Sequence, residues 1–317
     1  MFEVRAVERR YPVKRGAFGK RRWLRAVDGV DLTLTQGETL ALVGESGCGK
    51  STLARLLLRL EPPTAGEIRY AGRDLWAMDR EEIRRFRRQV QMVFQDPQAS
   101  LNPRMRVGQI VGEGMVIHRL ARGVELRERV ARLLEQVGLP PEAAEAYPHE
   151  FSGGQRQRIG IARALAVEPR VVVADEPVSA LDVSVQAQIL NLLQDLKEQH
   201  GLTYLFISHD LRVVEHISDR VAVMYLGRVV EEGPSEAVFA RPLHPYTEAL
   251  LTAVPVPDPE RRREPRVPEG DVPNPIDPPP GCPFHPRCPR RFGPCDREVP
   301  VVSEPEPGHR VRCHLHA

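Results

Sequence analysis

Apolar residues along the chain form short runs and helical stripes, which predicts a protein built from both strands and helices. The first 43 residues favour strands: an alternating stretch leads to a turn at Gln36-Gly37, and the apolar run Thr39–Val43 follows. A stripe of leucines next predicts a helix from Lys50 to about Leu60. From about 98 to 165 the spacing is helical, with one helix stopped at Gly138-Leu139-Pro140.

The second half of the chain alternates strands with helices. "VVVA" (171–174), "LTYLFIS" (202–208) and "VAVMYLG" (221–227) have the apolar character of buried strands, and a helix over 183–200 separates the first two. This alternation predicts an α/β fold with a mostly parallel sheet and helices on both faces. Ten of the thirty prolines fall within 254–280, which predicts an extended linker.

Composition and charge narrow the functional classes. The 45 lysines and arginines nearly balance 43 acidic residues, and a net charge of +2 gives no indication of nucleic-acid binding. No apolar run approaches the roughly 18 residues of a membrane span. The N-terminus has no apolar segment typical of a signal peptide, so we expect a cytoplasmic location and reduced thiols.

The stretch "GESGCGKST" (44–52) follows a predicted strand and opens a predicted helix, the context of a phosphate-binding loop. Glycines let successive backbone amides converge on phosphate oxygens, and the helix start adds positive potential. Lys50 is expected to reach the β- and γ-phosphates, Ser51 to ligate Mg²⁺, and Thr52 to bond near the α-phosphate. Cys48 is expected to fill space rather than to act as a nucleophile. The predicted contact residues are Gly44, Ser46, Gly47, Cys48, Gly49, Lys50, Ser51 and Thr52.

Two adjacent carboxylates end the apolar strand in "VVVADEP" (171–177). Asp175 would lie at the carboxyl edge of the sheet and hold Mg²⁺ through water. Glu176 would face the γ-phosphate and orient the attacking water or accept its proton.

A second anion-binding helix start follows from "FSGGQRQRIGIARAL" (151–165). Ser152 is a candidate N-cap, and Gly153 and Gly154 expose amides at the start of a helix over 155–166. One ATP rarely needs two such helix starts from one subunit. We therefore expect a face-to-face dimer that holds ATP between the loop of one chain and this signature of the other.

With these motifs the sequence resembles the ATP-binding subunits of ABC transporters, over residues 1 to about 250. The resemblance implies an ABC-type P-loop ATPase with a RecA-like parallel-sheet core, an antiparallel β subdomain and a helical signature subdomain at about 98–165. It implies that Gln95 in "VFQDP" senses Mg²⁺ and water and connects to the membrane subunit, and that the signature is Ser152 to Gln155. It further implies a D-loop at the dimer contact that ends at Asp182, and that His209 bonds the γ-phosphate and supports Glu176.

The resemblance also implies an aromatic residue stacked on adenine. Tyr11 fits that place best, and Phe18 and Trp23 compete for it because the stretch before the phosphate loop is long.

A narrower resemblance, to the ATPase subunits of oligopeptide and dipeptide ABC importers, extends to the last residues. It is carried by "QDPQASLNPRM", "HPYTEALLTAVP" (244–255) and "PGCPFHPRCP". It implies an ATPase domain over 1–253, a linker over 254–280 and a Cys-rich extension over 281–317. It also implies a second ATPase subunit (identical or paralogous), two membrane permeases, an extracytoplasmic solute-binding protein, and a peripheral position on the cytoplasmic face of the membrane.

Four cysteines lie in the extension, spaced C-x5-C-x6-C-x17-C. Irregular, long spacing suits a [4Fe–4S] cluster, whereas structural zinc more often uses tight pairs, and the resemblance implies such a cluster in some members. We expect a [4Fe–4S] cluster that clips the tail together; zinc, with His285, His309 or His314, and unligated or disulfide-linked thiols are the alternatives. The predicted ligands are Cys282, Cys288, Cys295 and Cys313.

Other classes of function fit less of the sequence. ABC-type ATPases that act on DNA or ribosomes typically carry a long coiled-coil insertion or two cassettes, and this chain has a single cassette and no sustained heptads. A small-molecule kinase would leave the signature and Gln95 unexplained. Among importers, nickel or another solute is the alternative to peptides.

Overall fold

The computed structural model describes residues 1–13, 22–253 and 270–317, which form two compact units. The first unit comprises Met1–Thr35, Thr39–Ala77 and Ser208–Ala317, and the second comprises Gln36–Glu38 and Met78–Ile207. Phe18 and the first part of the predicted linker, 254–269, lie outside the described residues.

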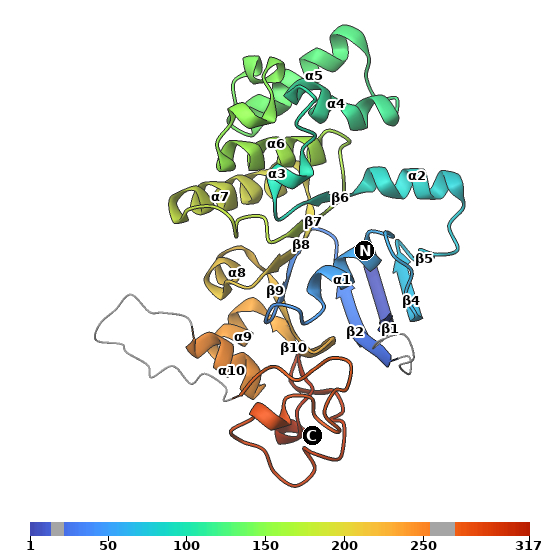
Figure 1. Ribbon diagram of the computed structural model, residues 1–317, viewed down its shortest axis with the longest axis vertical. Helices are drawn as coiled ribbons and strands as arrows, with labels where there is room; N and C mark the ends of the chain where they lie inside the picture. The colour runs from blue at the N-terminus through green and yellow to red at the C-terminus, as the bar shows by residue number, and fades with distance from the viewer. Residues whose placement is uncertain (14–21, 254–269) are drawn as a thin grey trace. The chain divides into compact units, whose positions relative to one another are not determined.

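The first unit contains an antiparallel sheet of four strands in the order β2-β1-β4-β5 (Figure 1). Long alternating sequences form the edge strand β2 and its neighbour β1, which pair from Phe2↔Leu34 to Val13↔Arg22 with bulges between. One face of this sheet packs into the core, where it buries Val4, Val7, Val27 and Val30. The strands are β1 (Phe2–Val13), β2 (Arg22–Leu34), β4 (Ala65–Tyr70) and β5 (Arg73–Asp74).

The same unit holds a second group of strands that positions the predicted phosphate loop. β3 (Thr39–Val43) is buried at all five residues and pairs in parallel with β9 (Arg220–Tyr225). β10 (Arg228–Pro234) pairs antiparallel with β9. The helices of the unit are α1 (Lys50–Leu57), α8 (Leu211–Ile217), α9 (Ser235–Ala240) and α10 (Pro245–Thr252).

The C-terminal tail packs on this unit rather than standing apart from it. β12 (His309–Val311) pairs with both β10 and β11 (Ser303–Glu306), and Phe284 is only 1% exposed. In Figure 1 the red tail runs beside α10 and the end of β10. Two 3₁₀ turns, His285–Arg287 and His314–His316, complete it. The tail therefore shares in the apolar core of the unit, which its proline-rich sequence did not suggest.

The second unit combines three parallel strands with the predicted helical segment. β6 (Val90–Val93), β7 (Val171–Asp175) and β8 (Thr203–Ser208) pair in that order, and α7 (Val183–His200) connects the last two as predicted. The helices α4, α5 and α6 contact one another. The remaining elements are α2 (Arg80–Gln89), α3 (Pro97–Ser100), α4 (Val107–Ile117), α5 (Gly123–Gln136), α6 (Gly153–Leu165) and the 3₁₀ turns Pro141–Glu145 and Pro148–Glu150.

Two predicted helix boundaries are wrong. α1 ends at Leu57 and not near Leu60, because Arg59 adopts a left-handed conformation (φ 56°) and Leu60 is 61% exposed. α6 begins at Gly153, two residues earlier than predicted, because Ser152 caps it. Among the described residues, no helix is both long and apolar enough to cross a bilayer.

Candidate nucleotide-binding site

The phosphate loop packs closely against neighbouring strands, and this packing explains why two of its residues are glycine. A Cβ atom on Gly44 (φ 148°) would lie 2.2 Å from the carbonyl oxygen of Met224, and one on Gly49 (φ 112°) would lie 2.1 Å from that of Ala26. Both glycines also have left-handed backbone angles that other residues avoid. Only glycine therefore fits at these two positions, whatever the loop binds.

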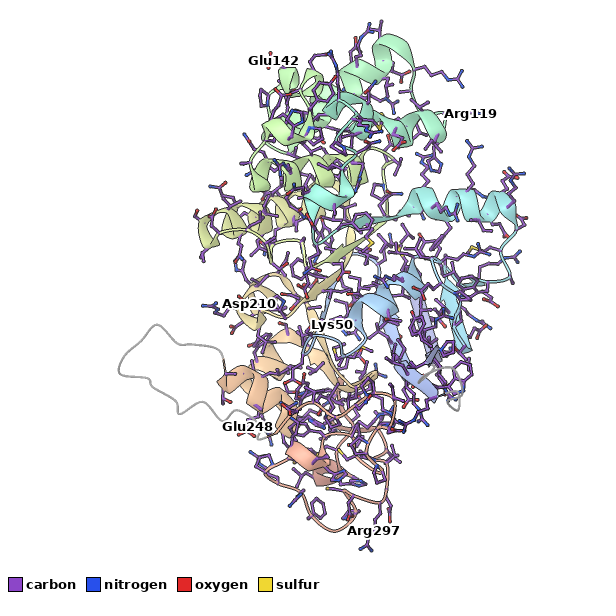
Figure 2. All side chains as sticks on the ribbon, in the orientation of Figure 1. Lys50, Arg119, Glu142, Asp210, Glu248 and Arg297 are labelled. Carbon is purple, nitrogen blue, oxygen red and sulfur yellow. The ribbon has the colours of Figure 1, made fainter. Side chains whose placement is uncertain are left out.

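Lys50, labelled in Figure 2, occupies the first position of α1, and its side chain turns back into the loop. Its Nζ donates to the carbonyl oxygens of Gly44 at 2.8 Å and Glu45 at 3.0 Å, and the side chain is buried. The ammonium group is thus held at the centre of the loop, beside the helix start where a phosphate would be bound.

Cys48 fits the predicted role of a space-filling residue. It is 5% exposed, and its sulfur lies 3.8 Å from Lys50 Nζ. Burial raises the pKa of the Cys48 thiol, against a smaller lowering by Lys50. A raised pKa disfavours the thiolate that a nucleophile would need.

Tyr11, the first candidate for stacking on adenine, lies at the end of β1. The Tyr11 hydroxyl donates to Glu61, which lowers the pKa of that carboxyl, and the Arg9 guanidinium lies 4.7 Å from the Tyr11 ring centroid. Trp23, the described competitor, pairs with Pro12 across the strands and is 47% exposed. Trp23 lies opposite Pro12 and so points to the same face as Pro12, whereas Tyr11, the neighbour of Pro12 on its strand, points to the other face. Tyr11 and Trp23 therefore lie on opposite faces of the sheet.

The predicted carboxylates end β7 in the second unit. Asp175 is 8% exposed, and Glu176 follows in a left-handed conformation (φ 47°). Gln95 Nε2 donates to Glu176 Oε2 at 2.9 Å. The structure thus brings together the two residues predicted to handle the attacking water. Holding a glutamate at positive φ costs about 1 kcal/mol or more, and such strain is typical of functional positions.

The predicted signature forms a capped helix start. Ser152 Oγ accepts from the Gln155 amide at 3.3 Å, and Gln155 Oε1 accepts from the Ser152 amide at 2.9 Å, so both side chains of this capping box are used. A Cβ atom on Gly154 would lie 2.4 Å from Val185 on α7. Gly154 therefore allows α6 to pack closely against α7, and its role at the nucleotide stays a prediction.

The other predicted residues lie at element ends. Asp182 caps α7, accepting from the Val185 amide at 3.0 Å and from the Ser184 hydroxyl at 2.7 Å, and these bonds lower the pKa of its carboxyl. His209 follows β8 and is exposed. Asp182 thus has a local structural role alongside the predicted one at the dimer contact.

The four cysteines of the tail lie near one another and carry no disulfide. Cys282, Cys295 and Cys313 are buried, and Cys288 is half-buried. Burial, with smaller contributions from the neighbouring thiols of Cys313, Cys295 and Cys288, raises the pKa of Cys282 to about 11. Within the described residues, however, no three histidine, cysteine or carboxylate side chains form a set that could hold a metal ion. The [4Fe–4S] cluster is therefore not supported by this arrangement and stays a prediction.

The histidines predicted as alternative zinc ligands are each engaged with a protein oxygen. His285 Nδ1 lies 2.9 Å from the Cys282 carbonyl oxygen, and His314 Nε2 lies 2.8 Å from that of Glu298. His309 is buried, and its Nε2 lies 2.8 Å from Glu231 Oε1. Each ring has one nitrogen already committed, so only the other nitrogen of each could meet a metal.

Comparison with known proteins identifies the family. Residues 27–179 match the family described as ABC transporter, and residues 230–295 match the oligopeptide/dipeptide transporter C-terminal region. A probable peptide ABC transporter ATP-binding protein of Sinorhizobium fredii is 54% identical over all of this chain and 90% of its own length. The chain belongs to the ATP-binding proteins of the ABC transporter family. The dipeptide transport ATP-binding protein DppF of Escherichia coli is 53% identical over 94% of this chain and 89% of its own.

Solved structures agree with the ABC ATPase fold. The ATP-binding cassette MJ0796, in a dimeric post-hydrolysis state bound to ADP and phosphate, is 31% identical with a TM-score of 0.66, over 74% of this chain and 99% of its own. CbiO1 of Clostridium perfringens, part of an ABC transporter complex, is 30% identical with a TM-score of 0.65, over 76% of this chain and 90% of its own. The predicted resemblance and the predicted ABC-type ATPase are thereby confirmed.

Sequence reasoning missed residues that support the phosphate loop of this ABC protein from outside. The Tyr246 hydroxyl, on α10, accepts from the Glu45 amide at 2.8 Å, and Arg287 of the tail binds the Glu45 carboxylate. Glu45 stands at a variable position of the loop motif, and its partners lie some 200 residues away in sequence. No local signal in the sequence points to these contacts.

Proposed function

We propose that this chain is the ATP-hydrolysing subunit of a peptide import system and drives transport through separate membrane permeases. The observation that carries the proposal is the combination, in one chain, of an ABC phosphate loop and a C-terminal segment matching the oligopeptide/dipeptide transporter family. Relatives of nearly full length bear peptide-transport names. Peptides are therefore favoured over nickel or another solute.

Nucleotide binding is assigned to the phosphate loop and the carboxylates. Lys50 would bind the β- and γ-phosphates, Ser51 and Thr52 the Mg²⁺ and the α-phosphate side, and Tyr11 the adenine. Asp175 would hold Mg²⁺. The buried ammonium group of Lys50 and the buried carboxylate of Asp175 support these roles, because a charged phosphate–metal ligand requires preorganised opposite charges.

Hydrolysis is assigned to Glu176, with Gln95 and His209 as its supports. Glu176 would orient the attacking water and accept its proton, Gln95 would respond to Mg²⁺ and that water, and His209 would bond the γ-phosphate. The 2.9 Å hydrogen bond from Gln95 to Glu176 supports this assignment, since it fixes one oxygen of the carboxylate in position.

Two such subunits, identical or paralogous, would close on two ATP molecules. Each ATP would lie between the loop of one subunit and the amides of Ser152 to Gln155 of the other, with Asp182 at the contact. Closure would drive two permeases supplied with peptide by an extracytoplasmic binding protein. The subunit would then lie on the cytoplasmic face of the membrane. The dimeric state of the MJ0796 cassette supports this arrangement by likeness.

Domain limits and the tail cluster belong to the same proposal. We assign an ATPase domain to 1–253, with its helical subdomain at about 98–165, a linker to 254–280, and a [4Fe–4S]-binding extension to 281–317. The residue type alone supports the cluster, since Cys282, Cys288, Cys295 and Cys313 carry the thiol donors that iron–sulfur clusters use. Anaerobic purification should give about four iron and four sulfide per chain, lost in Cys288→Ser and kept in Cys48→Ser. A colourless protein with one zinc would contradict it.

The transport function is tested by co-purification and uptake. A tagged full-length chain, isolated from mildly solubilised membranes, should bring down permeases, and proteoliposomes of that complex with its binding protein should accumulate peptide only with ATP. The Glu176→Gln complex should assemble equally and transport nothing. Recovery of ribosomes or DNA in place of permeases would support a non-transport ABC ATPase instead.

A further inference from the structure

The phosphate loop is connected to the tail by an ion pair that the proposed roles do not use. Arg287, between Cys282 and Cys288, donates from Nη1 to Glu45 Oε2 at 2.8 Å and from Nη2 to Glu45 Oε1 at 3.0 Å. Two parallel bonds of this kind fix the carboxylate in orientation as well as in position. Glu45 directly follows Gly44, so the pair holds the loop itself.

Burial makes this pair different from the surface ion pairs of the protein. The Arg287 side chain is 7% exposed and that of Glu45 is 27% exposed. The hydrogen bonds to Glu45 raise the pKa of the Arg287 guanidinium against the opposing effect of burial. A buried guanidinium that lost its carboxylate would be left uncompensated, which is costly. Arg287 therefore opposes any movement of Glu45 away from its present position.

Arg287 is itself held in place by aromatic packing. Its turn begins after Phe284, whose ring centroid lies 5.3 Å from that of Tyr225 and 5.4 Å from that of Tyr246. The Tyr225 hydroxyl is a further, longer acceptor for Arg287 Nη1 at 3.5 Å, and the Tyr246 hydroxyl accepts the Glu45 amide. The tail thus supports Glu45 in two ways. Arg287 binds the side chain of Glu45, and Phe284 packs against Tyr246, which binds the backbone amide of Glu45.

The contacts continue from Glu45 to the lysine of the loop. The Glu45 carbonyl oxygen accepts from Lys50 Nζ at 3.0 Å, and it also accepts from the Cys48 amide at 3.3 Å. A shift of Glu45 would therefore displace an acceptor of Lys50 and open the turn that carries the loop. Phosphate binding depends on such placement, because the amides and the ammonium group must converge on one point.

We propose that Arg287 is a positioning residue for nucleotide binding, which acts through Glu45 to hold the phosphate loop in its binding-competent conformation. This inference rests on the proposed ATPase function. It gives the cysteine-rich tail a second role, as the support of the loop and not only as a metal-binding appendage. Removing the pair should weaken ATP binding more than it slows the chemistry of bound ATP.

The experiment measures ATP affinity by equilibrium titration of the full-length chain with a fluorescent ATP analogue. Arg287→Met keeps the length of the side chain and removes its charge; Glu45→Gln removes the charge from the loop side. Both should weaken binding on the order of tenfold, and the double variant should be no weaker than either single variant. Arg287→Lys should fall between, since lysine cannot form the paired bonds.

A matched control comes from the same segment of the tail. Arg290 lies two residues after Cys288, and it pairs with Glu248 on α10 rather than with the loop. Arg290→Met should leave ATP affinity unchanged. Thermal unfolding of every variant separates loss of fold from loss of binding, and steady-state hydrolysis should show a raised KM with kcat largely kept.

The outcomes distinguish this inference from the proposed function. If Arg287→Met and Glu45→Gln bind ATP as tightly as Arg290→Met while only melting earlier, the pair is structural and the inference is wrong. If Arg287→Met does not fold, Glu45→Gln decides the same question from the loop side. If the unaltered chain neither binds nor hydrolyses ATP, the proposed function fails, and this inference fails with it.

Discussion

Replacing Phe284 with alanine should detach the tail from the ATPase core and so tests how the tail is held. The ring is 1% exposed and meets three others, with centroid distances of 5.3 Å to Tyr225, 5.4 Å to Tyr246 and 5.6 Å to His244. It also belongs to the apolar cluster that includes Val223 of β9. One side chain thus joins the tail to β9 and α10.

The expected loss follows from this burial. Truncation of a fully buried phenylalanine lowers the free energy of unfolding by about 3–5 kcal/mol. Because Phe284 also loses its aromatic contacts, we expect a loss of about 4 kcal/mol. The matched control is Phe292, in the same tail and 49% exposed, for which alanine should cost no more than about 0.5 kcal/mol.

Urea unfolding of the full-length variants gives the free energies, and hydrogen exchange of the β12 amides reports the tail directly. Phe284→Ala should lower the unfolding free energy and speed exchange in β12, which pairs with β10 only while the tail is docked. Equal effects of Phe284→Ala and Phe292→Ala would refute the packing argument.

Three further predictions concern single side chains. Burial lowers the pKa of His244 from 6.5 to about 4, so the folded state keeps this side chain neutral. The folding stability is therefore full above pH 6.5 and falls by about 3 kcal/mol as the pH drops to about 4. The variant His244→Asn should flatten that part of a pH–stability profile. Ser152→Ala removes a capping side chain, which should cost about 1 kcal/mol in urea unfolding, whereas an unchanged midpoint would contradict the capping role. Lys50→Ala should abolish ATP binding in the same fluorescence titration without unfolding the chain, and retained affinity would contradict the assignment of the loop.

Local sequence signals predicted the elements that are decided by neighbouring residues. Thr39–Val43 and Val183–His200 appear as predicted because an unbroken apolar run and a helical stripe each specify one element. Ser152 and Lys50 were found because motif spacing fixes them at helix starts. β6 was missed: four residues directly after a strongly charged helix carry too little pattern.

Long-range contacts could not be predicted from such signals. β12 pairs with β10 across nearly eighty residues, and Glu231 meets His309 over the same separation. The bond from Arg287 to Glu45 spans most of the chain, and nothing local to either residue specifies the other. The positive φ angle of Glu176 likewise depends on a distant residue, because the Glu176 amide donates to the Ile207 carbonyl oxygen at 2.9 Å.

The central claim is that ATP is held between the phosphate loop of one subunit and the signature of another. A structure of the hydrolysis-blocked Glu176→Gln assembly with Mg²⁺ and ATP tests it most directly. The account predicts that Lys50 of one subunit and the Ser152 and Gly154 groups of the opposite subunit all contact the same γ-phosphate. A fully loaded assembly with Ser152 and Gly154 remote from every nucleotide would contradict it.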